Sequence, residues 1–198
     1  MDKTHLILSL RKHGFSEEII TAFEHVARED FVPEHWREHA YDDIPLEIGQ
    51  GQTISQPYTI AFMLSLLELE KGYKILEVGS GSGYVLALLN ELAPDSEIYG
   101  VERLSALVNR SKRVLRFNKK IRIFKKDGSK GFRNFAPYDR ILVSASADEI
   151  PEKLIEQLKE NGILVIPVKN SIFKIKKTKT GLIKREFSGF AFVPLIEE

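Results

Sequence analysis

The residues best suited to chemistry lie between Leu76 and Tyr84, in the stretch Leu-Glu-Val-Gly-Ser-Gly-Ser-Gly-Tyr. An acid, Glu77, precedes three glycines at alternate positions, Gly79, Gly81 and Gly83. Because glycine has no Cβ, such positions adopt positive φ and let a ligand approach the main chain without a clash. The stretch therefore predicts a loop that holds a cofactor.

The acid and the glycine spacing indicate which cofactor. Dinucleotide-binding loops read G-x-G-x-x-G and place a pyrophosphate at a helix N-terminus, whereas this loop reads G-x-G-x-G. The Glu77 carboxylate would repel a pyrophosphate but suits an amino group or an amino acid that carries a sulfonium. No Gly-Lys-Ser or Gly-Lys-Thr follows, which excludes a P-loop. These features favour S-adenosylmethionine.

The flanking segments fit a nucleotide-type site. Residues 73–78 form a short apolar run, 84–92 carry leucines at helical spacing, and 97–101 resemble the next strand. Glu102 ends that strand about 20 residues past the glycines, where such folds place an acid on the ribose hydroxyls. An ordinary strand-turn-helix connection with a surface glutamate is the alternative, but it does not explain why all the parts fall at the expected spacing.

Composition limits the class of protein. The 198 residues suit one α/β domain, and the net charge of +1 gives no general attraction to nucleic acid or membrane. The absence of cysteine excludes disulfides, thiol catalysis and thiolate metal sites. Neither a signal peptide nor an apolar run of about 18 residues is present. We therefore expect a cytoplasmic protein.

The first part of the chain predicts two amphipathic helices over 3–13 and 17–28. A long connection over 31–57 follows, with no regular element beyond a turn over 34–39. Connections of this length in a compact domain are usually functional or disordered, and its apolar residues argue against disorder. Pro57 is expected to open the next helix.

Strands and helices then alternate, which predicts a mainly parallel sheet covered on both faces. The strands are expected near residues 74, 98, 121, 139 and 162. A hairpin is predicted from 172–177 and 182–187, and a last strand from 190–195. The fold class is α/β: a doubly wound, mainly parallel Rossmann-like methyltransferase sheet with N-terminal helices and an antiparallel C-terminal edge.

One domain over 1–198 is expected to contain three parts. Residues 1–56 would hold the N-terminal helices and a loop that covers substrate and cofactor, 57–168 the cofactor-binding core, and 169–198 the hairpin and the last strand.

Methyl transfer from a sulfonium is an in-line displacement that requires contact between donor and nucleophile and exclusion of water. A carboxylate nucleophile is already ionised near pH 7, so no strong general base is needed. The histidines agree with this expectation, because all of them lie in the first 39 residues and none lies in the predicted α/β core: His5, His13, His25, His35 and His39. The segment 35–39 matches the H-x-x-E-H pattern of zinc peptidases, but no long helix or third ligand accompanies it, and no metal is expected.

Several motifs strongly resemble the protein-L-isoaspartate O-methyltransferases. They are Arg28–Pro33, Ala40–Leu46, Ile48–Pro57, Leu76–Tyr84, Asp127–Gly131, Pro137–Ile141, Ile150-Pro151, Leu158-Lys159 with Gly162, Val165–Val168 and Phe192–Leu195. The resemblance covers nearly the whole chain. It implies methyl transfer from S-adenosylmethionine to the α-carboxyl group of L-isoaspartyl residues, which starts the repair of aged proteins and leaves S-adenosylhomocysteine.

The resemblance also implies roles for individual residues. Ser55 corresponds to the active-site serine, Asp127 to an acid that contacts adenine, and 192–195 to a strand that hydrogen-bonds the substrate peptide. The implied cofactor site comprises Gln52, Thr53, Ile54, Ser55, Glu77, Gly79, Ser80, Gly81, Glu102, Arg103, Asp127 and Gly128. The implied substrate site comprises Thr53, Ile54, Ser55, Phe192, Val193 and Pro194. Phe190-Ala191 departs from the Val-Arg pair common in bacterial members.

Structural alternatives exist for three of these motifs. Ser55 could simply cap the helix that begins at Pro57, Asp127-Gly128 could be an ordinary turn, and 192–195 could be a core strand.

Two basic clusters leave an RNA or small-molecule methyltransferase of the same fold as the alternative function. The clusters are Arg110, Lys112, Arg113, Arg116, Lys119, Lys120 and Arg122, and Lys169, Lys174, Lys176, Lys177, Lys179, Lys184 and Arg185. A solvated helix face and a charged hairpin that protects a sheet edge explain them more simply. Neither cluster has the repeated aromatics of a single-strand platform. The expected partners are isoaspartyl proteins and peptides, without nucleic acid or membrane, and the expected state is a monomer.

Overall fold

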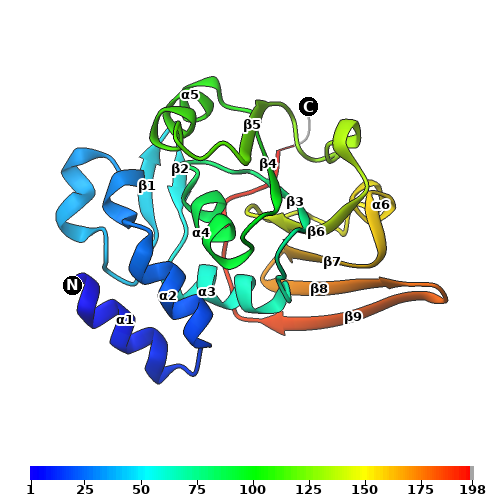
Figure 1. Cartoon of the computed structure of the whole chain (residues 1–198), viewed down its shortest axis with the longest axis horizontal. Helices are drawn as coiled ribbons and strands as arrows, with labels where there is room; N and C mark the ends of the chain where they lie inside the picture. Colours follow the sequence, from blue (N-terminus) through cyan, green and yellow to red (C-terminus); the bar gives the residue numbers. More distant parts are fainter. Residues whose placement is uncertain (197–198) are drawn as a thin grey trace.

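A computed structural model describes residues 1–196 of the chain (Figure 1). The helices are α1 (Lys3–Lys12), α2 (Glu17–His25), α3 (Pro57–Leu66), α4 (Tyr84–Leu92), α5 (Ser105–Val114) and α6 (Glu152–Glu156), with 3₁₀ turns η1 (Arg28–Phe31), η2 (Glu34–His39) and η3 (Arg133–Phe135). The strands are β1 (Leu46–Gly49), β2 (Gln52–Ile54), β3 (Lys74–Val78), β4 (Glu97–Glu102), β5 (Ile121–Lys125), β6 (Tyr138–Val143), β7 (Leu158–Val168), β8 (Ser171–Thr178) and β9 (Gly181–Ser188).

The main sheet has seven strands in the order β5-β4-β3-β6-β7-β8-β9. The five strands from β5 to β7 are parallel to their neighbours, and β8 and β9 add antiparallel pairs. The predicted fold class is confirmed, including the hairpin around Thr180-Gly181. The chain builds outward from β3 to β5 and then restarts with β6 on the other side of β3. Ligands bind at such a switch point, outside the carboxyl ends of the strands.

Alternate residues of the strands point to opposite faces, so the sheet separates two apolar cores. On β3, Ile75 belongs to the core that also contains buried residues of α1 to α5. Its neighbour Leu76 belongs to the other core, with Leu154 of α6. Both side chains are fully buried. Glu77 is the next residue on the Ile75 face, so the strand alternation directs it toward the side covered by α3 and α4.

The N-terminal part differs from the sequence prediction in two places. The second helix ends at His25 and not at residue 28, because Arg28 begins a separate 3₁₀ turn. The long connection also contains a hairpin, β1–β2, which the sequence analysis missed. Its turn has positive φ at Gly49, Gln50 and Gly51, and the pairing register shifts before it. Four-residue and three-residue strands around such a turn are too short to give a periodic signal.

The predicted last strand over 190–195 is wrong as a regular element. Within the described residues, this segment makes a single bridge, from Pro194 to Ser146, and Pro194 lacks the N–H that a ladder requires. It runs in extended form from β9 toward the opposite end of the sheet, as the red trace in Figure 1 shows. Among residues 1–196, no helix is both long enough and apolar enough to span a membrane.

Candidate active site

The glycine loop follows β3 directly. Gly79, Gly81 and Gly83 have φ of 78°, 49° and 87°, as the sequence predicts. The N–H groups of Gly79 and Ser80 donate to the carbonyl of Val101, at 2.9 and 3.1 Å, which fixes the loop against the end of β4. Since β3 pairs in register with β4 and β6, the residues after these three strands meet at one edge of the sheet.

Glu77 is the main electrostatic feature of this edge. Its side chain is 1% exposed, and its Oε1 accepts a hydrogen bond of 2.8 Å from the Ser144 Oγ. Its Oε2 is buried and has no hydrogen-bond partner among residues 1–196. Burial raises the pKa of Glu77 to about 8, and the nearby charge of Glu102 adds to this, while the Ser144 hydrogen bond opposes it. Because an unpaired buried carboxylate is costly, the site favours a bound cation or donor at Oε2.

A central cavity lies in front of Glu77. Besides Glu77, six of the sequence-predicted cofactor residues line it: Thr53, Ile54, Ser55, Gly79, Ser80 and Gly81. The buried Ser80 Oγ has no hydrogen-bond partner among residues 1–196. The sequence analysis missed the remaining lining residues apart from Phe192: Ile60, Met63, Ser82, Tyr84, Val85, Leu142 and Ser144. The sequence could have indicated Ser144, because this residue directly follows the strand predicted near residue 139, and ligands bind after the carboxyl ends of such strands.

A second cavity shares Gly79 with the central one. It brings together the other predicted cofactor residues, namely Gln52, Glu102, Arg103, Asp127 and Gly128. Pro194, which the resemblance assigned to the substrate, lies here as well, beside Leu195 and Ile196.

Two acids in the second cavity are held in place by short hydrogen bonds. Glu102 accepts from the N–H groups of Gly81, at 3.1 Å, and Leu104, at 2.8 Å, so it connects the glycine loop to the start of α5. Asp127 accepts from the N–H and Oγ of Ser129, at 2.8 and 2.9 Å. These contacts fix the directions in which the carboxylates face a ligand.

Gly128 is required by close packing of the sheet. A Cβ at this position would lie 2.6 Å from a methyl carbon of Val78 and 2.8 Å from one of Val101. The turn after β5 therefore approaches the strand ends more closely than any larger residue permits.

The third cavity is an open groove between the start of α3 and the segment Gly189–Val193. It shares Thr53, Ser55 and Phe192 with the central cavity, so Ser55 lies where the two meet. The predicted substrate residue Val193 also lines the groove, whereas Ile54 faces only the central cavity. The three cavities thus adjoin one another at these shared residues.

Ser55 does not cap α3. The N-cap residue is Gln56, whose side chain makes no capping bond. Instead, the carboxylate of Asp43 accepts from the Tyr58 N–H at 2.8 Å and from the Gln56 Nε2 at 3.1 Å. Ser55 makes no hydrogen bond within residues 1–196, so its hydroxyl is available to a ligand.

A buried arginine supports this arrangement. Arg28 is fully buried, lies over the Tyr84 ring with 5.3 Å between its Cζ and the ring centroid, and interacts electrostatically with Asp43. Burial lowers the pKa of Arg28 to about 10. A positive charge behind Asp43 stabilises the carboxylate that holds the start of α3.

The histidines and the basic clusters lie elsewhere. No histidine lines the three cavities, and His39 pairs with Asp42. Within the part of the chain that the structure describes, no group of three or more His, Asp or Glu could hold a metal ion. Part of the first basic cluster lines a separate cavity between α5 and β5, which shares no residue with the other three. In the second cluster, Lys174 pairs with Glu68, and Lys177 donates to backbone carbonyls.

Comparison with known proteins gives concordant matches over the whole chain. The family model described as Protein-L-isoaspartate(D-aspartate) O-methyltransferase (PCMT) matches residues 1–198. A protein-L-isoaspartate O-methyltransferase of Ignicoccus hospitalis is 44% identical over an alignment of 207 residues. The alignment covers 99% of this chain and 98% of the relative.

Solved structures agree with the sequence matches. One protein-L-isoaspartate O-methyltransferase superimposes with a TM-score of 0.89 at 28% identity, over 98% of this chain and 65% of the other. A Plasmodium falciparum PCMT in complex with S-adenosyl-L-homocysteine superimposes with a TM-score of 0.86 at 28% identity, over 100% of both chains.

Proposed function

The chain belongs to the protein-L-isoaspartate(D-aspartate) O-methyltransferase family, and we propose that it transfers a methyl group from S-adenosylmethionine to the α-carboxyl group of L-isoaspartyl residues in proteins and peptides. The observation that carries this proposal is that the central cavity adjoins the second cavity at Gly79 and the groove at Ser55. A cofactor can extend through the two smaller cavities and present its reacting end to a substrate in the groove.

The residues present suit this cofactor. Glu77 Oε2 and Ser80 Oγ are buried polar atoms without partners, and a cationic amino acid group would satisfy them. Glu102 and Asp127 are the acids of the adjoining cavity, where we assign them to the ribose and the adenine. Gln52, Gly79, Arg103 and Gly128 complete that part of the proposed cofactor site.

Bound S-adenosylmethionine supplies an electrophilic methyl group on a sulfonium. The protein's part is to bring an ionised substrate carboxylate into line with that methyl and to exclude water. We assign to the Ser55 Oγ a hydrogen bond donated to one carboxylate oxygen, which orients the other oxygen toward the methyl. The apolar side chains of Ile54, Met63 and Phe192 line the same cavity and limit hydration of the carboxylate. No proton is transferred in this step, so the absence of histidine from the cavity walls is compatible with it.

The backbone of the last segment supports binding of an extended peptide. The Val193 carbonyl accepts from the Ser146 N–H at 2.8 Å, and the Leu195 N–H donates to the Ser146 carbonyl at 2.7 Å. The N–H and C=O of Phe192 take part in no hydrogen bond within residues 1–196. In an extended segment they face away from Ser146, where a substrate backbone can pair with them.

The test uses labelled S-adenosylmethionine and matched peptides that contain aspartyl or isoaspartyl residues. Base-labile label on the isoaspartyl peptide alone is the expected result. Equal labelling of both peptides, or labelling of neither, would contradict the proposal, and label on RNA would favour the alternative acceptor. Ser55→Ala should lower turnover while S-adenosylhomocysteine still binds. Unchanged turnover would remove Ser55 from the mechanism.

We further propose that the protein acts as a cytoplasmic monomer, with residues 1–56, 57–168 and 169–198 contributing the covering loop, the cofactor core and the peptide-binding edge. Light scattering at assay concentrations should give the mass of one chain, 22.6 kDa. A mass of two chains would contradict the monomer.

A further inference from the structure

The groove has no charged residue on its walls among residues 1–196. Eleven of these residues line it, from Pro45 to Val193, and none is Asp, Glu, Lys, Arg or His. Charged residues make up 29% of the whole chain, so their absence here is a local property of the groove. A charged substrate side chain would lose hydration on entering without gaining an ionic partner from the walls.

One wall of the groove is an aromatic stack. Phe190 stacks on Phe62 with ring centroids 5.2 Å apart and an interplanar angle of 20°. Tyr58 is nearly parallel to Phe62 at 6.5 Å, and Phe187 meets Phe62 edge-on at 5.2 Å. Tyr58 and Phe190 line the groove, and both are half-buried. Because these rings already hold one another, a ligand that packs on them orders few new side chains.

The groove adjoins the reacting centre. Thr53, Ser55 and Phe192 line both the groove and the central cavity, so a substrate with its isoaspartyl carboxylate at Ser55 places its neighbouring residues in the groove. This inference rests on the proposed function, because it takes the isoaspartyl residue as the group bound at Ser55.

We propose that the groove selects the side chain next to the isoaspartyl residue, and that Phe190 and Tyr58 make the enzyme favour an aromatic or bulky apolar side chain there over a charged one. The preferred substrates are therefore damaged sites in apolar sequence contexts. Ala191, exposed on the groove wall, leaves no ionic group to attract an acidic or basic neighbour.

The test is a set of isoaspartyl peptides that differ only in one neighbour of the isoaspartyl residue, placed on either side in turn: Phe, Leu, Ala, Glu or Lys. We expect kcat/KM for Phe to exceed that for Glu and Lys by roughly tenfold at one of the two positions. The difference should appear in KM, because the neighbour is bound equally in the ground and transition states. Methylation of none of the peptides would refute the proposed function itself. Equal kcat/KM for all five would leave the function standing and refute the selection.

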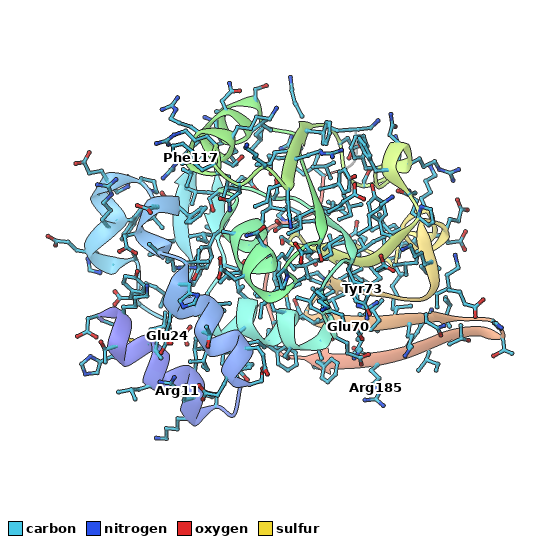
Figure 2. All side chains as sticks on the ribbon, viewed as in Figure 1. Arg11, Glu24, Glu70, Tyr73, Phe117 and Arg185 are labelled. Carbon is cyan, nitrogen blue, oxygen red and sulfur yellow. The ribbon has the colours of Figure 1, made fainter. Side chains whose placement is uncertain are left out.

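Three variants assign the preference to residues. Phe190→Ala should reduce the Phe-over-Ala ratio of kcat/KM about fivefold, and Phe190→Tyr should retain it. Phe117→Ala is the matched control, since Phe117 is 78% exposed and is not one of the residues that line the groove. Figure 2 shows Phe117 beside α5. An equal loss of the ratio in both alanine variants would contradict a role for Phe190.

Ala191→Lys keeps the aromatic stack and adds one positive charge to the wall. It should raise kcat/KM for the Glu peptide about threefold and lower it for the Lys peptide. If neither value changes, the residues next to the isoaspartyl group do not lie in this groove.

Discussion

Glu77→Gln should stabilise the protein in the absence of cofactor while weakening cofactor binding. Burial raises the pKa of Glu77 from 4.5 in the unfolded chain to about 8 in the folded one. Between these pH values the folded protein holds a proton that the unfolded chain releases. The stability that protonated Glu77 contributes is therefore fully present below pH 4.5 and is lost as the pH rises through 8. Glutamine resembles the protonated carboxyl group at every pH.

The magnitude follows from the pKa difference. With 1.36 kcal/mol per pKa unit, the variant should exceed the wild type in unfolding free energy by about 3 kcal/mol at pH 7 and by about 5 kcal/mol at pH 9. Near pH 4 the difference should approach zero. For a chain of this size, about 3 kcal/mol corresponds to a rise in melting temperature of about 6 to 12 °C.

Denaturant unfolding without cofactor, from pH 4 to pH 9, measures this difference directly. Glu47→Gln, at an exposed position on β1, controls for the general effect of removing one acid. A variant that is less stable than the wild type, or a stability difference that does not grow with pH, would refute the reasoning about burial.

Calorimetry with S-adenosylhomocysteine tests the second half of the prediction. A cation bound at Glu77 Oε2 favours the ionised carboxylate, so binding to the wild type at pH 7 should release close to one proton. Glu77→Gln should bind more weakly and release none. Equal affinity and equal proton release in both proteins would show that the amino group of the cofactor does not contact Glu77.

Three further substitutions test the surroundings of the site. Ser144→Ala removes the one hydrogen bond that the Glu77 side chain makes within residues 1–196 and should weaken S-adenosylhomocysteine binding about tenfold by calorimetry; unchanged affinity would contradict that role. Asp43→Ala removes the carboxylate that caps α3 and should lower the free energy of unfolding by about 1 kcal/mol in denaturant unfolding. It should also lower kcat/KM, because Ser55 is displaced. Lost stability with unchanged kcat/KM would show that the cap does not position Ser55 for catalysis. Gly128→Ala should cost about 1 to 3 kcal/mol, because its Cβ would lie 2.6 Å from Val78, and a neutral effect would show that the strand ends relax.

Local patterns predicted most of the regular elements. The leucine spacing after Gly83 places a helix where α4 lies, and Pro57 opens α3 as expected. The turn at Thr180-Gly181 joins β8 and β9. Each of these signals depends on residues close together in sequence, since helical spacing, a missing N–H and a turn glycine all act within a few positions.

Other features depended on residues far apart in sequence. The hairpin β1–β2 is short, and its apolar residues Leu46, Ile48 and Ile54 are buried only because the glycine loop and the helices pack against it. The segment 190–195 has the alternation of a strand, but among residues 1–196 its backbone makes one bridge, to Ser146, and one further hydrogen bond, from the Phe190 N–H to the Asn170 carbonyl. A short apolar run does not indicate which segments of the chain will form hydrogen bonds with its backbone.

The sequence by itself determined the cofactor loop, the acids that precede and follow it, and the parallel sheet that carries them, because each follows from glycine conformation, charge and periodicity within short stretches. Only the tertiary structure decided that, among residues 1–196, one Glu77 carboxylate oxygen is hydrogen-bonded to Ser144 and the other has no partner, that Asp43 rather than Ser55 caps α3, and that no charged residue lines the groove beside Ser55. These properties arise from strand register and from loops that meet across the carboxyl edge of the sheet. Burial and partner distances exist only once distant segments are packed together.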